Sequence, residues 1–128
     1  MRRSLLSLLL LSSPAFGLSS PPSIEACDYR FTSGSPMKSD TCRVDSSFNM
    51  GIIFLSISPV KESMKFKLWT DPAQRESNTA EIVSGTNIVW EGTFTSASDG
   101  VNSQCRPGGY GATKYTMNNG GFVCLYSR

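Results

Sequence analysis

Residues 47–69 read SFNMGIIFLSISPVKESMKFKLW, and this stretch indicates the fold class. In residues 47–58, apolar side chains occupy both faces of an extended chain, which is typical of a strand that is buried on both sides. In residues 64–69, apolar side chains alternate with two lysines, which predicts a half-buried strand. Residues 59–62 form a connector between the two runs. We therefore expect these runs to pair as one antiparallel hairpin.

The rest of the chain also shows a period of two residues and shows no helical period. Further short strands are expected over residues 28–32, 81–83, 86–95 and 120–126. Turns or loops are expected over residues 33–41, 84–85 and 96–103, and a helix only over residues 72–76. The sequence therefore predicts an all-β domain, which is a small antiparallel β-barrel or sandwich.

The first residues have the pattern of a secretory signal. Two arginines precede an apolar run over residues 5–11, and a small-x-small cleavage site ends at Gly17. We therefore expect a signal peptide over residues 1–17, a flexible polar leader over residues 18–26 and a single β domain over residues 27–128. The protein is predicted to be secreted and extracellular.

The balance of charge argues against two classes of partner. The full chain has 12 Lys and Arg against 10 Asp and Glu, but cleavage after Gly17 removes Arg2 and Arg3 and leaves a neutral protein. A neutral protein with scattered charges lacks the basic patch that binds nucleic acid or an anionic membrane. We therefore expect neither nucleic acid nor a membrane among its partners.

The chain has no histidine and four cysteines, and both facts limit its chemistry. Without imidazole there is no Ser-His-Asp or Cys-His catalysis and no histidine-ligated metal. Four cysteines in a secreted chain predict two disulfides, for which three pairings exist. The spacing favours the local pairs Cys27–Cys42 and Cys105–Cys124. A zinc site usually needs cysteines only two or so residues apart, which this chain lacks.

Two groups of residues are candidates for a functional site. Among the scattered carboxylates, only Glu91, which follows Trp90, has a predicted apolar setting, and a glycosidase would need a second carboxylate across a cleft. A solvated carboxylate on the face of a strand is the commoner case. The aromatic side chains could form a platform for a sugar or a flat phenolic compound, although core packing explains most such residues. These aromatic residues are Trp69, Trp90, Tyr29, Tyr110, Tyr115 and Tyr126.

The most distinctive string of the chain is CRPGGYG at residues 105–111. Its glycines permit positive φ and close approach of the backbone. It does not match a phosphate-binding loop, because no strand leads into it, no helix follows it and no Gly-Lys-Ser/Thr is present. We interpret the string as a turn that is held by a disulfide at Cys105.

Several motifs together resemble those of a known family. They are the cysteine loop 27–42 with the following Ser47-Phe48-Asn49-Met50, the run at residues 87–94, the Cys-Arg-x-Gly-Gly string from Cys105 to Gly109, and the closing Phe122-Val123-Cys124. Over most of residues 27–124 the chain is similar to the secreted fungal β-barrel family of the Alternaria major allergen, which includes plant-elicitor proteins. The resemblance implies two local disulfides and no established catalytic residue. It also implies binding of host defence proteins or small phenolic ligands.

Compared with this family, the chain is shortened at its N-terminus. Family members have several strands before the first of these cysteines, whereas here Cys27 follows the predicted signal almost directly. The upstream cysteine that can bridge two subunits has no counterpart, and an insertion is expected around residues 112–119. We therefore expect an incomplete barrel with unpaired strand edges, which would favour a non-covalent homo-oligomer.

These observations predict a secreted, non-catalytic, effector-like fungal protein of the allergen/elicitor type that acts outside the cell by binding a host protein or a small phenolic ligand. We assign it no catalytic, cofactor-binding or metal-ligating residue and no cofactor. The first alternative is a small secreted hydrolase that uses a carboxylate pair including Glu91. The second is a structural protein of the cell wall or cell surface.

Overall fold

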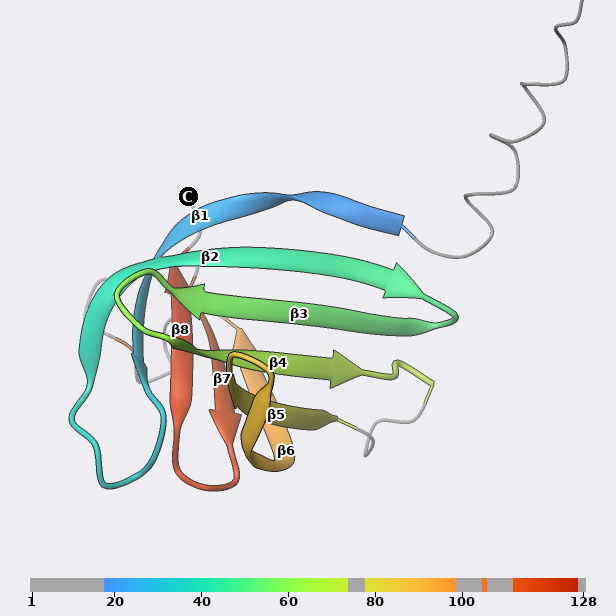
Figure 1. Cartoon of the computed structure of the whole chain (residues 1–128). Coiled ribbons are helices and arrows are strands. Elements are labelled where there is room, and N and C mark those ends of the chain that lie inside the picture. The colour runs from blue at the N-terminus through green and yellow to red at the C-terminus, as the bar shows by residue number, and fades with distance from the viewer. Residues whose placement is uncertain (1–17, 74–77, 99–104, 106–111, 127–128) are drawn as a thin grey trace, which may run out of the picture.

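The computed structural model describes residues 18–73, 78–98, 105 and 112–126. Over this part of the chain, eight strands follow one another in chain order around a closed antiparallel barrel (Figure 1). The strands are β1 (Leu18–Arg30), β2 (Lys38–Asn49), β3 (Ile52–Pro59), β4 (Met64–Thr70), β5 (Thr79–Ser84), β6 (Asn87–Ser98), β7 (Ala112–Met117) and β8 (Phe122–Tyr126). The all-β prediction is confirmed, and of the two predicted architectures the chain adopts the barrel.

Several expectations concern residues outside the described part of the chain. The signal peptide over residues 1–17 and the glycine-rich string after Cys105 both lie there. Residues 72–73 form a turn, and the rest of the helix expected over residues 72–76 is again outside. Where the structure describes the chain, it contains no helix of the length and apolarity needed to cross a membrane.

The barrel interior is built from residues that alternate along each strand. Phe66 on β4 lies opposite Ile57 on β3 and Ile82 on β5, and all three side chains are fully buried. The ring of Phe66 also stacks on the ring of Phe31, with 4.7 Å between the centroids. This inward and outward alternation is the reason that a period of two residues predicts the strands.

The stretch at residues 47–58 forms a hairpin, so the prediction of one strand buried on both sides is wrong. Met50 and Gly51 have φ values of 53° and 83° and reverse the chain between β2 and β3. Both central residues of a type I′ turn need positive φ, which Asn and Gly adopt readily and Met rarely adopts. Because methionine is unusual at this position, the sequence pattern does not indicate the turn.

Residues 18–26, expected to form a flexible leader, are instead the first part of β1. This strand pairs with β2 from Leu18 onward and with β8 from Ala26 onward. Its register shifts between Ser20 and Ser23, at two prolines that have no N–H to donate to a neighbouring strand. Serine and proline are typical of a linker, but a strand with exposed side chains and a bulge also accommodates them.

Residues 112–119, expected to be an insertion, contain a strand that helps to close the barrel. Strand β7 lies between β6 and β8, and β8 also pairs with β1. Strand β6 reaches both neighbours because its first half pairs with β5 and its residues 94–98 pair with β7. Part of the loop expected over residues 96–103 is therefore strand. The expectation of an incomplete barrel is wrong, so unpaired edges do not support a homo-oligomer.

The two predicted disulfides are both present. Cys27–Cys42 joins β1 to β2, and Cys105–Cys124 attaches the segment before β7 to β8. All four cysteines are therefore consumed, which is incompatible with a zinc site built from them.

One carboxylate is buried beside these disulfides. Asp28 is fully buried, and its carboxylate accepts hydrogen bonds from the hydroxyls of Ser39 and Tyr126.

The turn before β8 packs closely against the segment that follows β1. A Cβ atom added at Gly121 would lie 2.5 Å from the carbonyl oxygen of Phe31, which is a backbone atom and has little room to move. We therefore expect Gly121→Ala to lower the free energy of unfolding by about 1–3 kcal/mol, as measured by urea denaturation. Gly34→Ala is the matched control, because no atom lies within 4 Å of the added Cβ. Equal effects at the two positions would contradict the close packing at Gly121.

Candidate functional site

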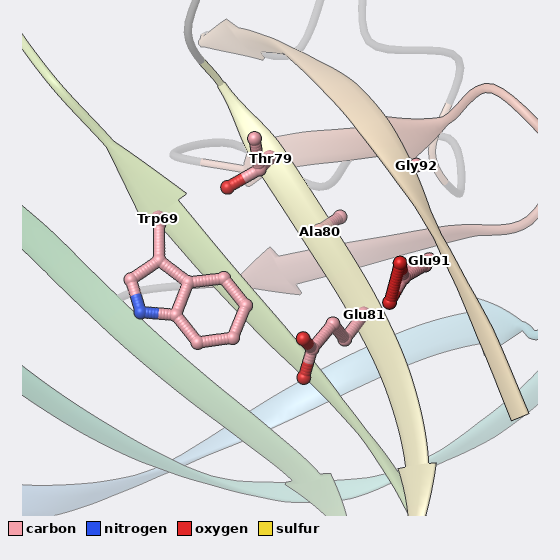
Figure 2. A pocket seen from close by; sticks show the side chains of 6 residues that line it. All are labelled: Trp69, Thr79, Ala80, Glu81, Glu91 and Gly92. Carbon is pink, nitrogen blue, oxygen red and sulfur yellow. The ribbon is translucent and has the colours of Figure 1, made fainter. Parts of the chain in front are cut away.

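An open groove on the outer face of β4, β5 and β6 is the candidate functional site (Figure 2). Its volume is about 410 Å³. Three outward-pointing side chains, one from each strand, give it chemical character: Trp69, Glu81 and Glu91. The other lining residues are Thr79, Ala80 and Gly92.

The register of the sheet brings the two carboxylates of the groove together. Glu81 on β5 lies directly opposite Glu91 on β6. In such cross-strand pairs the Cβ atoms are about 4.5–5.5 Å apart, so the two negative charges repel each other. The pairing depends on a bulge: Val83 lies opposite Ile88 but Ile82 lies opposite Trp90, so β6 has one additional residue.

Neither carboxylate of the groove takes part in an ion pair among the described residues. The ion pairs there are Lys38–Glu62 and Arg43–Asp45. The cation opposite Glu81 on β4 is Lys67, with which it forms no ion pair. Ionised carboxylates only accept hydrogen bonds, so the groove presents acceptor oxygens to a ligand that carries donors.

Trp69 forms the aromatic wall of the groove. Its ring packs against the ring of Phe54 on β3, with 5.2 Å between the centroids. In Figure 2 the indole extends from β4 toward β5 and Glu81. Because Phe54 supports the indole from the β3 side, the ring is held in place next to the two carboxylates. A flat aromatic or sugar ring can stack on such a surface.

The structure places the predicted aromatic residues at separate sites, so the prediction of a shared aromatic platform is wrong. Trp69 lines the groove, whereas Trp90 and Tyr115 pack against the core inside the barrel. Tyr29 is buried, Tyr126 donates to Asp28, and Tyr110 lies outside the described residues. Successive side chains of a strand point to opposite faces of the sheet, and some of these aromatic residues lie on strands far apart in the barrel. They would form one surface only if the register placed them on the same face of neighbouring strands.

The predicted apolar setting of Glu91 is also wrong. Trp90, its neighbour in the chain, points to the inner face, while the side chain of Glu91 is exposed on the outer face. The aromatic residue of the groove is Trp69, two strands away. The sequence pattern does not indicate Glu81 as the partner of Glu91, because its place opposite Glu91 follows from the bulge in β6.

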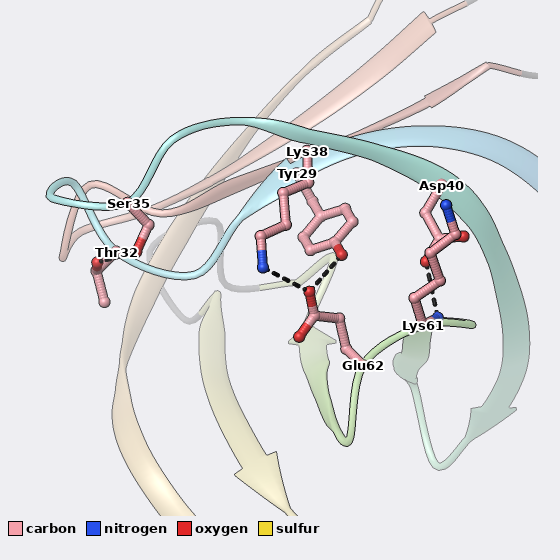
Figure 3. A network of polar contacts seen from close by, with 7 residues as sticks. All are labelled: Tyr29, Thr32, Ser35, Lys38, Asp40, Lys61 and Glu62. Atoms are coloured by element: carbon pink, nitrogen blue, oxygen red, sulfur yellow. Dashed lines mark hydrogen bonds and ion pairs between the residues drawn. The ribbon is translucent and has the colours of Figure 1, made fainter.

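A second polar cluster lies at one end of the barrel (Figure 3). The Tyr29 hydroxyl donates to Glu62 over 2.6 Å, and the Lys38 ammonium donates to the same oxygen over 3.1 Å. These two hydrogen bonds hold the pKa of Glu62 below its usual value, while burial and the nearby carboxylate raise the pKa of Tyr29. Each named polar group has a partner, so the cluster stabilises the end of the barrel and leaves no open ligand site.

Asp40 completes this cluster through the backbone. It accepts hydrogen bonds from the backbone N–H groups of Lys61 and Thr41, at 2.8 Å and 2.7 Å. Burial opposes its ionisation, but these hydrogen bonds outweigh burial and lower its pKa. Asp40 therefore ties the β3–β4 turn to β2.

No metal site is found among the described residues, where no three Cys, Asp or Glu side chains lie close enough to hold an ion. Comparison with protein-family models, with curated proteins and with solved structures finds no match to this chain. The comparisons assign it to no family. The resemblance to the allergen family therefore remains an interpretation of the sequence motifs.

Proposed function

We propose that this protein is a secreted, non-catalytic binding protein of the allergen/elicitor type, and that it takes a phenolic group into the groove over β4–β6. The observation that carries the proposal is the position of Trp69 beside Glu81 and Glu91, two carboxylates without an ion pair among the described residues. The barrel and the two disulfides agree with what the sequence resemblance implies. Disulfides of this kind are typical of proteins that fold in an oxidising environment.

A phenolic ligand matches both parts of the groove. Its ring can stack on the indole of Trp69, and its hydroxyl groups can donate hydrogen bonds to Glu81 and Glu91. A diphenol with neighbouring hydroxyls has two donors for the two adjacent carboxylates. Because hydrogen bonds to charged acceptors are stronger than those between neutral groups, the carboxylates contribute to both affinity and orientation.

The same chemistry is available on a protein surface. A tyrosine side chain carries a phenol, and the groove is open at the outer face of the barrel, where a host protein has access to it. We therefore keep a host defence protein as the alternative ligand of this site. Binding of a protein through the groove requires the same residues as binding of a free phenol.

A secreted hydrolase is the competing function, because Glu81 and Glu91 form a carboxylate pair. A glycosidase requires one carboxyl group that stays protonated as the general acid, and an apolar surrounding normally provides this. The side chain of Glu91 is exposed and lies on the opposite face of β6 from that of Trp90, so Trp90 does not provide the apolar surrounding expected from the sequence. The binding function is therefore the better fit to the geometry.

Calorimetric titration with catechol tests the proposed function. We expect catechol to bind and its dimethyl ether, which has the same ring but no hydroxyl donor, to bind at least tenfold more weakly. Trp69→Leu and the double variant Glu81→Gln/Glu91→Gln should each lose at least tenfold in affinity. Asp45→Asn is the matched control, since Asp45 is an outward carboxylate on β2 that does not line the groove.

Two results would overturn the proposal. Equal binding of both compounds by all variants would show that the groove is not the site. Turnover of a polysaccharide or of RNA that is abolished by Glu91→Gln would show that the protein is a hydrolase. If a host protein binds and catechol does not, loss of binding in Trp69→Leu identifies the groove as a protein-binding site.

A further inference from the structure

The turn between β2 and β3 projects beyond the strands on either side of it. The last pair between β3 and β4 is Ile53 with Thr70, and the first pair between β1 and β2 is Leu18 with Phe48. Among the described residues, those between these two pairs (residues 49–52) therefore pair with no strand other than their own hairpin partner. Figure 1 shows this turn at the far end of the long strands, beyond the ends of β4 and β5. We call residues 48–53 the hairpin tip.

The hairpin tip exposes large apolar side chains on both of its faces. Phe48 and Ile53 pair with each other and point to the inner face, whereas Ile52 points to the outer face. Met50 occupies the turn itself. The exposed fractions are 89 % for Met50, 45 % for Phe48, 39 % for Ile52 and 38 % for Ile53.

The polarity of the sheet changes in steps away from the hairpin tip. No charged residue occurs between Asp45 and Lys61, so the tip, the last residues of β2 and the whole of β3 are uncharged. Behind the tip, on the outer face, lie the paired aromatic rings of Phe54 and Trp69. The next outward row carries the charges of Asp45 and Lys67. An apolar end, an aromatic row and then a charged row is the order of side chains across a membrane–water interface.

We propose that the hairpin tip inserts into the interfacial region of a lipid bilayer. A partner that docks on one face of the sheet would leave the apolar side chains of the other face in water. Fluid lipid surrounds an inserted hairpin on both faces, so it covers Phe48, Ile53 and Ile52 together. This inference goes beyond the proposed function, and the tip contains no residue that lines the groove.

The length of the hairpin fits insertion into the interfacial region of the bilayer. Phe54 is three residues from Gly51, which corresponds to roughly 10 Å of strand, and interfacial segments bury their apolar faces by about 5–10 Å. Insertion to the level of Phe54 places Trp69 among the headgroups and keeps Asp45 and Lys67 in water. Asp71, which directly follows β4, then has to lie at the headgroup level. The expectation of no membrane partner was based on the missing basic patch, which matters for anionic lipid. Because the tip carries no charge, its binding does not require anionic lipid, and our proposal replaces that expectation.

Flotation with phosphatidylcholine vesicles tests the proposal, using the secreted protein with its N-terminus determined by mass spectrometry. We expect the wild type to float with the vesicles at low and at high salt. Met50→Asn/Ile52→Thr should reduce the bound fraction at least tenfold. Met50→Asn creates the Asn-Gly pair favoured by a type I′ turn, so this variant is expected to fold. Val60→Asn is the control, because Val60 is 65 % exposed but lies in the β3–β4 turn.

Three results would overturn the proposal. The first is a wild type that stays with the soluble fraction, and the second is equal flotation of the wild type and the tip variant. The third is a dimer, detected by light scattering, that Met50→Asn/Ile52→Thr dissociates while no form of the protein floats. In that case a second copy of the chain covers the tip. Catechol binding by the tip variant reports on the groove separately, so failure of one proposal is distinguishable from failure of the other.

Discussion

Phe66→Ala is expected to lower the free energy of unfolding by about 3–5 kcal/mol, which is the usual cost of removing a buried phenylalanine ring. The side chain of Phe66 is fully buried, stacks on Phe31 and lies between Ile57 and Ile82 of the neighbouring strands. Its removal leaves a cavity at the centre of the barrel, where three strands and the end of β1 meet. Urea denaturation followed by circular dichroism measures the loss.

Phe48→Ala is the matched control for this prediction, because it deletes the same ring from the hairpin tip. Phe48 is 45 % exposed, so its removal uncovers less apolar surface and leaves no enclosed cavity. We expect a loss of less than half of that for Phe66→Ala. A similar loss at the two positions would mean that the core of the barrel is not centred on Phe66.

Replacing Cys27 and Cys42 together by alanine is expected to cost roughly 3 kcal/mol of stability, which is the contribution of a 15-residue loop in the chain-entropy model. The disulfide links β1 to β2 directly, and both cysteines are fully buried. Without the disulfide, the unfolded chain regains the conformational entropy of this loop, while the folded barrel keeps the same strand pairing. The free energy of unfolding therefore falls. Thermal and urea unfolding of the double variant measure the effect.

The second disulfide provides the comparison. Cys105–Cys124 closes a loop of similar length, with a separation of 19 residues, so the same model predicts a similar loss for its removal. Cys105 is partly exposed, whereas Cys27 and Cys42 are buried, so mild reductant should open Cys105–Cys124 first. Wild-type stability in either double variant would contradict the loop-entropy argument for that bond.

Where the sequence shows a plain alternation, the fold could be predicted from it. The lysines of residues 64–69 alternate with Met64, Phe66 and Leu68, and the structure makes this stretch β4. The spacing of the cysteines likewise predicts both disulfides. These features could be predicted because they depend on the local pattern, in which the polarity of each side chain indicates whether it is buried.

Features that depend on one backbone detail could not be predicted from the same patterns. A two-residue hairpin turn without a bulge would place Glu81 opposite Trp90. The additional residue in β6 places Glu81 opposite Glu91 instead, and so produces the paired carboxylates of the groove. In the same way, positive φ at Met50 converts one apparent strand into β2 and β3 and creates the hairpin tip. Both parts of the molecule for which we propose a function result from such local irregularities.

The pairing of β1 with β8 determines when this protein can finish folding. Ala26 lies opposite Tyr126, so β1, the first of the described strands to be synthesised, must wait for β8, the last of them. Contacts between residues so far apart in the chain form slowly, because a large loop has to close. During this interval Cys27 and Cys42 can already form their bond and keep β1 attached to β2. An oxidising folding compartment would therefore keep β1 attached to β2 until β8 is made, so that only the edge of β1 that faces β8 stays open to other newly made chains.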